Sequence, residues 1–332
     1  MPVNSIAGRA AFLLLAAGGL PADAMGAGAL ADTDLNPLTV VFGFPDSTEG
    51  ATLRPDGQHG LSLTLASASH NVESLEANER LAYDGETSRL AMAWRYGVSD
   101  RLELGGEVSY LWHHSGNLDS LIDDWHDFFG LPNGPRDRRE QDQLDFSYLD
   151  DQGSSVNLHH NTHGPGDVRL MAGWQLPGSR DHRRALRFSI KLPTGNTGRI
   201  LGSGGTDFSL GLAGDVAAIR KSSRWSGHYR ADVIRIGRPE FLSGRSNPVV
   251  GQLAGGLSYK AGTVDLKAQG RVRSALYESA IRNLGGVSVH LVFGAEFRMP
   301  RGYALALSVG EDVRPDTAPD VTFQVALRYV GR

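Results

Sequence analysis

Apolar and polar residues alternate with a period of two in segment after segment of this chain. In residues 101–112 the even positions from Leu102 to Trp112 are apolar, except for Gly106, while most odd positions are polar. Successive side chains of a strand point to opposite faces, so this pattern predicts a strand with one apolar and one polar face. Similar segments occur at 60–69, 87–97, 166–176, 185–193, 207–218, 224–236, 249–260, 263–273, 286–298, 302–310 and 320–330.

The connections between these predicted strands alternate in length. Short connections fall at 97–100, 177–184, 219–223, 260–263 and 299–301, and longer ones at 70–86, 113–165, 194–206, 237–248, 274–285 and 311–319. An even number of strands, with short turns at one end and long loops at the other, is typical of outer-membrane barrels. We therefore predict an all-β fold, a single transmembrane antiparallel β-barrel of about 12 strands within residues 60–332.

Large aromatic residues gather on the apolar face near the short turns, at Tyr96, Trp174, Trp225, Tyr259, Phe297, Tyr303 and Tyr329. Amphipathic rings favour the boundary between lipid and water, whereas a soluble core would hold its aromatic residues near strand centres. This distribution predicts that the apolar face contacts lipid.

The polar face then lines the lumen, and its charged residues are the candidate functional residues. They are Glu103, Glu107, Arg169, Arg187, Lys191, Asp215, Arg230, Asp232, Lys267, Arg271, Arg273, Glu296 and Arg328. Two arrangements remain open at this point. Opposite charges could pair into a network that fills the lumen, or they could line a water-filled path that selects solutes by charge and width.

The N-terminus has the pattern of a secretory signal peptide. Arg9 precedes an apolar run at 10–20, which is too short to span a bilayer, and cleavage candidates follow at Ala24 and Ala31. We assign residues 1–31 to the signal peptide and residues 32–59 to a mature N-terminal segment. This segment lies either in the periplasm or inside the lumen.

Residues 113–165 form the longest predicted connection, which we place on the extracellular side. Apolar residues recur at helical spacing over 118–129 and predict a short amphipathic helix, ended by the "GLP" of 130–132. This helix either packs on the barrel rim, narrows the lumen or lies on the membrane surface. The segment also holds ten acids and six of the eleven histidines. They lack a fixed metal-ligand spacing, so we predict no metal site and no cofactor.

Composition excludes further classes of function. The formal net charge is -4 and no basic stripe with interleaved aromatic residues occurs, which argues against a nucleic-acid partner. The chain has no cysteine, and therefore neither disulfides nor thiolate chemistry. His113, His114 and Ser115 follow a predicted strand and suggest a lipid hydrolase as an alternative, but adjacent residues rarely form a nucleophile, base and orienting group. We therefore predict no catalytic residues.

The sequence resembles domain-of-unknown-function family 3187, a group of exported proteins of Gram-negative bacteria. The resemblance rests on "DGET" and "WHDFFGLPNGPR", and the motif residues are Asp84, Gly85, Glu86, Trp125, His126, Gly130, Leu131 and Pro132. It implies an outer-membrane barrel and brings no established activity.

From these patterns we predict a narrow outer-membrane channel or transport barrel for small solutes. The alternatives are a lipid-modifying hydrolase and a structural barrel with a plugged lumen. The expected partners are outer-membrane lipid, lipopolysaccharide and the barrel-assembly machinery during biogenesis.

Overall fold

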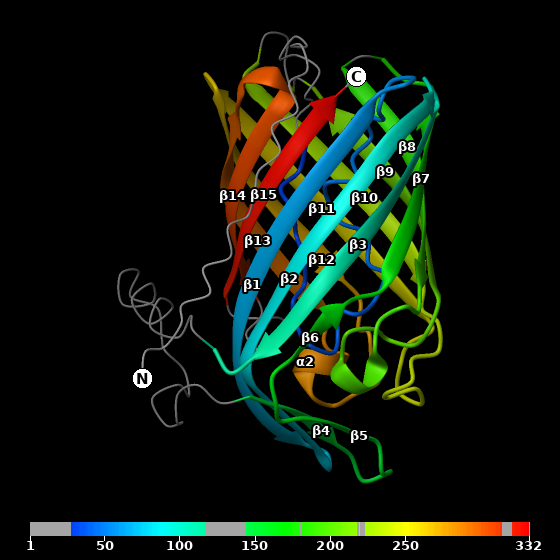
Figure 1. The fold of residues 1–332 in the computed structure, drawn as a ribbon, viewed down its shortest axis with the longest axis vertical. Helices are drawn as coiled ribbons and strands as arrows, with labels where there is room; N and C mark the ends of the chain where they lie inside the picture. The colour runs from blue at the N-terminus through cyan, green and yellow to red at the C-terminus, as the bar shows by residue number, and fades with distance from the viewer. Residues whose placement is uncertain are drawn as a thin grey trace, which may run out of the picture.

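A computed structural model describes residues 28–116, 144–179, 181–217, 219, 223–313 and 321–331. Its strands form a closed antiparallel barrel of the predicted type (Figure 1). The barrel strands are β1 (His59–Glu76), β2 (Glu79–Ser99), β3 (Leu102–His114), β7 (Val168–Leu176), β8 (His182–Leu192), β9 (Asp207–Val216), β10 (Trp225–Arg235), β11 (Val249–Ala261), β12 (Val264–Arg273), β13 (Ser288–Arg298), β14 (Tyr303–Asp312) and β15 (Val321–Gly331). The predicted number of barrel strands is confirmed.

The first and last strands close the ring. β1 pairs with β15 over eleven residues, from His59 opposite Gly331 to Ser69 opposite Val321. Every other barrel strand pairs antiparallel with its neighbours in the sequence, with β7 following β3 around the ring. A closed ring has no free strand edge, which hydrocarbon requires because it offers backbone groups no hydrogen-bond partner.

The outer surface of the barrel is apolar. Leu253 is 61% exposed and Trp174 is 46% exposed, although both are large hydrophobic residues on barrel strands. Aromatic rings pair across strands near the short turns, with centroids 5.0 Å apart for Trp225 and Tyr259 and 4.8 Å apart for Tyr303 and Tyr329. Soluble monomers rarely expose an apolar surface that surrounds the whole molecule, so this surface fits a lipid environment.

Residues 28–58, here called the lumen segment, run inside the barrel rather than outside it (Figure 1). Gly28 and the end of β15 line one cavity at the short-turn end. The segment passes to the long-loop end, where the Leu38 carbonyl accepts a hydrogen bond from Tyr277 at 2.8 Å. It then returns to the short-turn end, where the Gly57 amide donates to the Gly97 carbonyl at 2.9 Å. The structure therefore places the predicted N-terminal segment in the lumen.

At the long-loop end β1 and β2 continue beyond the barrel, and the prediction of a loop at 70–86 is wrong. The two strands remain paired up to a tight turn at Ala77 and Asn78, whose positive φ angles of 46° and 68° suit a two-residue hairpin turn. The turn has no glycine, so its sequence gives little indication of a hairpin.

Three further strands lie within the predicted loop 113–165. β4 (Asp145–Leu149) pairs with β2 and with β5 (Ser155–Leu158), and β6 (Thr162–Pro165) pairs with β3. The outer parts of β1 and β2, together with β4 and β5, are here called the lid. The amphipathic helix predicted over 118–129 lies outside the described residues.

Short helical turns occur in the connections, α2 (Arg282–Gly285), η3 (Thr197–Arg199) and η4 (Pro300–Gly302). Within the described part of the chain, no helix has the length and apolar character needed to cross a membrane.

Candidate functional site in the barrel lumen

The structure places the thirteen candidate lumen residues on the inner wall, around the lumen segment. Ten of them are fully buried in the barrel, namely Glu103, Arg169, Arg187, Lys191, Arg230, Asp232, Lys267, Arg271, Arg273 and Glu296. Glu107, Asp215 and Arg328 are partly exposed to the lumen cavities. The wall charges therefore face protein atoms of the same chain, rather than an open water-filled path.

Glu49 of the lumen segment holds the centre of this network. One carboxylate oxygen lies 2.5 Å from Arg169 Nη1, and the other lies 3.3 Å from Arg230 Nη1. Each arginine also contacts a wall carboxylate, Arg169 with Glu107 at 3.3 Å and Arg230 with Asp232 at 2.8 Å. Glu49 is 2% exposed, so its charge is compensated by these guanidinium groups instead of by water.

A second cluster lies on the first leg of the lumen segment, the part that runs from the short-turn end toward the long-loop end. Asp32 lies 2.6 Å from His290 Nδ1 and 3.4 Å from Arg271 Nη2. Asp34 accepts a hydrogen bond from Arg273 Nη2 at 2.8 Å. All of these side chains are buried, so the segment carries carboxylates to the positions where the wall carries buried cations.

Backbone groups fix the start of the lumen segment on the wall. Gln269 accepts a hydrogen bond from the Leu30 amide at 2.9 Å and donates one to the Leu30 carbonyl at 3.1 Å. Lys267 donates to the Gly28 carbonyl and Arg328 donates to the Ala29 carbonyl at 2.6 Å. Residues 28–31, which the sequence assigned to the signal peptide, are thus bound as part of the lumen segment.

The returning leg packs equally closely against the opposite wall. Arg187 donates to the Gly50 carbonyl at 2.9 Å and to Glu103 at 2.5 Å. The Gly43 amide donates to Asp207 at 2.8 Å, and a Cβ at this glycine would lie 2.7 Å from the Cβ of Lys191. A side chain at position 43 would therefore displace the segment from the wall, so close packing at this position requires glycine.

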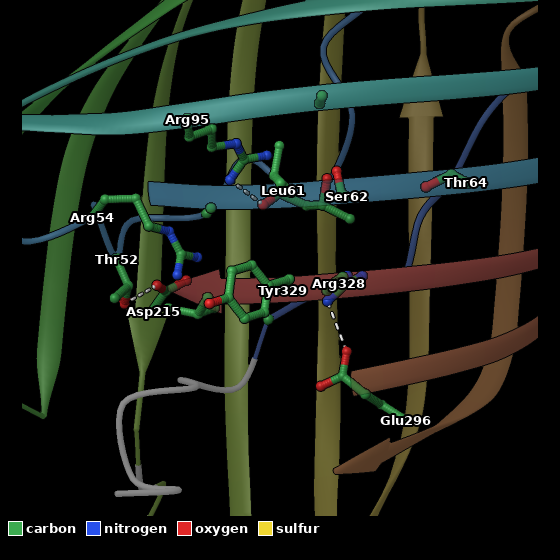
Figure 2. Close-up of a pocket in the computed structure, with 16 residues that line it drawn as sticks. Thr52, Arg54, Leu61, Ser62, Thr64, Arg95, Asp215, Glu296, Arg328 and Tyr329 are labelled. Carbon is green, nitrogen blue, oxygen red and sulfur yellow. Dashed lines mark hydrogen bonds and ion pairs between the residues drawn. The ribbon is translucent and has the colours of Figure 1, made fainter. Parts of the chain in front are cut away.

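Among the described residues, small cavities lie between the lumen segment and one side of the barrel wall. The cavity at the short-turn end has a volume of about 100 Å³ and is lined by Arg54, Arg95, Asp215 and Arg328 together with threonine and serine hydroxyls (Figure 2). The others, of about 20, 40 and 30 Å³, share lining residues with one another and reach Leu201 near the other end. A cavity of about 10–15 Å³ holds one water molecule. Each of these cavities is therefore large enough for at least one water molecule, and the described residues leave only these small cavities along β1–β3 and β7.

An apolar cluster fills the long-loop end of the lumen. The turn of the lumen segment contributes Leu38, Val41 and Phe42, and the lid contributes Tyr83, Phe146 and Tyr148. The connections and strand ends on the far side contribute further residues, among them Ile236, Leu242, Leu276, Tyr277, Ile281 and Leu284. Among the described residues, apolar side-chain packing therefore fills this end of the lumen.

Ion pairs hold the lid on the loops of the far wall. Arg245 lies 3.0 Å from Glu79 and 2.7 Å from Asp150. Although burial alone would raise the pKa of Asp150, hydrogen bonds from the amides of Gln152 and Ser154 and from Arg245 lower that pKa below its ordinary value of 3.8. Asp150 is therefore ionised at neutral pH and ties the lid to Arg245.

The geometry gives no support to the hydrolase alternative. His113 is buried, with Nδ1 3.1 Å from the Thr87 hydroxyl and Nε2 2.9 Å from the Ile200 carbonyl, so both ring nitrogens are occupied within the fold. Among the described residues no hydrogen bond joins the Ser115 hydroxyl to a histidine. The same part of the chain contains no group of three His, Asp or Glu residues that could hold a metal ion.

The "DGET" motif lies where β2 changes partner. Glu86 is opposite His114 of β3, whereas Asp84 is opposite Asp145 of β4. Between them Gly85 has a φ of 130°, a conformation that residues with a side chain rarely adopt. The other motif residues, Trp125, His126, Gly130, Leu131 and Pro132, lie outside the described residues.

Sequence reasoning missed the residues that complete the network. Asp32, Asp34 and Glu49 belong to a segment without strand periodicity, and Gln269 and His290 fall outside a prediction limited to Asp, Glu, Lys and Arg side chains. One signal was available, since the predicted inner face carried more basic than acidic residues and required a source of negative charge.

A comparison with a solved outer-membrane channel agrees with the barrel fold. The COG4313 outer membrane channel from Pseudomonas putida F1 aligns with a TM-score of 0.53 and 14% identity, over 83% of this chain and 96% of that one. The toluene transporter TodX from P. putida aligns at 0.38 with 12% identity, over 92% and 98%, and the KdgM porin at 0.41 with 11% identity, over 81% and 98%. No curated protein matches the sequence. The family "Protein of unknown function (DUF3187)" matches residues 10–330, so the chain belongs to this family.

Proposed function

We propose that this protein is an outer-membrane channel for small polar solutes, and that the lumen segment closes it in the structure described here. The apolar, aromatic-edged outer surface supports a membrane location, with lipid and lipopolysaccharide around it. The predicted signal peptide and barrel-assembly machinery supply the route to the membrane. By analogy with outer-membrane barrels, the short-turn end faces the periplasm and the lid faces the exterior.

The row of polar cavities beside the lumen segment is the observation that carries this proposal. A barrel with only a structural role has no need for polar cavities along the length of its interior. Here the cavities follow one wall from the short-turn mouth toward Leu201, between the barrel and a segment that contributes no strand to the sheet. Displacement of the segment would join them into a single path.

Cross-linking the lumen segment to the wall tests the proposal directly. Ala51 of the segment shares a buried cluster with Ala185 and Ala213 of the wall. We expect the variants Ala51→Cys/Ala185→Cys and Ala51→Cys/Ala213→Cys to form a disulfide under oxidation, and the absence of native cysteine makes this bond the only one available. Ala51→Cys alone is the matched control.

Current across planar lipid bilayers is the measurement. The reduced double variants and the oxidised control should conduct like the native protein, whereas the oxidised double variants should be silent until a reductant is added. Equal currents in oxidised and reduced double variants would show that solutes do not need displacement of the segment. Silence of the native protein and of every variant would favour the plugged structural barrel instead.

A further inference from the structure

The buried wall of the barrel carries an excess of positive charge. Among the described residues of β3 and β7–β13, seven fully buried side chains are cationic and four are carboxylates. The cations are Arg169, Arg187, Lys191, Arg230, Lys267, Arg271 and Arg273, and the carboxylates are Glu103, Asp207, Asp232 and Glu296. Removing a charge from water is costly without a partner, so the excess needs anions from outside the wall.

The lumen segment supplies that negative charge. Its fully buried charged residues are all acidic, namely Asp32, Asp34 and Glu49. Each lies against an arginine of the wall, at 3.4 Å for Asp32, 2.8 Å for Asp34 and 2.5 Å for Glu49. The closed lumen therefore holds three carboxylate groups in sites formed by guanidinium groups.

These arginines can bind more acceptors than the segment provides. Arg230 Nη2, Arg271 Nε and both Nε and Nη1 of Arg273 have no hydrogen-bond acceptor within the described part of the structure. A guanidinium group presents five donors in a planar fork that matches both oxygens of a carboxylate. A solute with free carboxylates could thus make bonds that Asp32, Asp34 and Glu49 leave unmade.

The cavity at the short-turn mouth repeats this chemistry. Arg54, Arg95 and Arg328 line it together with the hydroxyl groups of Ser62 and Thr64 and the carboxylates of Asp215 and Glu296 (Figure 2). Arg54 Nε lies 4.0 Å from Glu103 and has no hydrogen-bond acceptor of its own within the described residues. Guanidinium groups therefore line the path from the mouth to the centre of the barrel.

We propose that the solute is a small organic anion that carries carboxylate groups and replaces the carboxylates of the lumen segment. It binds first among Arg54, Arg95 and Arg328, and then between the Arg169–Arg230 and Arg271–Arg273 pairs that Glu49, Asp32 and Asp34 occupy in the closed state. This inference rests on the proposed channel function and names its substrate class.

Ion selectivity and block in planar bilayers test this proposal. The reversal potential of the full-length protein under a tenfold KCl gradient should show preference for chloride over potassium. Millimolar succinate should reduce the open-channel current, whereas the neutral analogue succinamide should not. In Arg271→Gln/Arg273→Gln the succinate concentration for half block should rise at least tenfold, while the exposed control Arg301→Gln should behave like the native protein.

The outcomes separate the two proposals. A conducting pore that prefers potassium, or that succinate and succinamide block equally, would overturn the anion proposal and leave the channel function standing. Block by succinate that survives in Arg271→Gln/Arg273→Gln would overturn the assigned site. Absence of any current from native and variant protein would overturn the channel function itself.

Discussion

Replacement of Glu49 by glutamine should release the lumen segment from the centre of the barrel. Glutamine preserves the size of the side chain but removes the charge that faces Arg169 at 2.5 Å and Arg230 at 3.3 Å. Removing one partner of a buried ion pair typically costs about 3–5 kcal/mol, because it leaves the other charge uncompensated. Both arginines keep a wall carboxylate, Glu107 or Asp232, which places the expected cost near the lower value.

A cost of about 3 kcal/mol corresponds to roughly a hundredfold change in an equilibrium constant, at about 1.4 kcal/mol for each factor of ten. We therefore expect the open probability of Glu49→Gln in planar bilayers to rise on the order of 10²-fold where opening is rare, together with a lower temperature of unfolding. Asp56→Asn, at an exposed position of the same segment, should change neither quantity.

A double variant tests the electrostatic reason for this effect. Glu49→Gln/Arg169→Gln also removes one of the two guanidinium charges that Glu49 compensates, so its open probability should fall back toward the native value. An open probability and unfolding temperature of Glu49→Gln that match those of Asp56→Asn would refute the reasoning.

Three further predictions concern the ends and the surface of the barrel. Because residues 28–31 are bound to the wall, we expect signal peptidase to cleave after Ala24. The intact mass of the purified protein should then correspond to a chain that starts at Met25. A mass that corresponds to a start at Asp32 would contradict this prediction. Because the pKa of Asp150 is lowered in the folded protein, the stabilisation by its carboxylate is complete above the ordinary pKa of 3.8 and is lost as the pH falls through the lower folded value. The unfolding temperature should therefore drop in this acidic range. The variant Asp150→Asn should lose this pH dependence. Leu253→Arg, on the apolar outer surface, should destabilise the barrel by about 2–4 kcal/mol in lipid bilayers, measured by denaturant titration, and an unchanged midpoint would contradict lipid contact at this position.

The barrel strands could be predicted because their pattern is local. A strand between lipid and a polar interior must alternate at every residue, so segments such as 101–112 and 286–298 show the full period of two. The parts that extend beyond the membrane lack this constraint. The outer parts of β1 and β2 show no regular alternation of buried and exposed residues. The strands β4 and β5 do alternate, but over only five and four residues, which is too short for the pattern to stand out within the long connection.

The inner wall could be predicted only in part. Parity along each strand indicates which charges face inward, but it does not indicate what those charges contact. Asp32 is 258 residues away from His290 in the sequence, and no local pattern connects the two. The path of the lumen segment depends on many such distant contacts, which only the folded barrel brings together.

The lumen segment enters and leaves the barrel at the same end, and this geometry restricts how it can be withdrawn. Gly28 lines the short-turn mouth, and Gly57 is hydrogen-bonded to the β2–β3 turn at that mouth, while the packed lid covers the opposite opening. A force that extracts the lumen segment must therefore act from the periplasmic side in the proposed orientation. A protein that pulls on the lumen segment at Gly28 from that side would open the pore, whereas a molecule arriving from outside would first meet the lid.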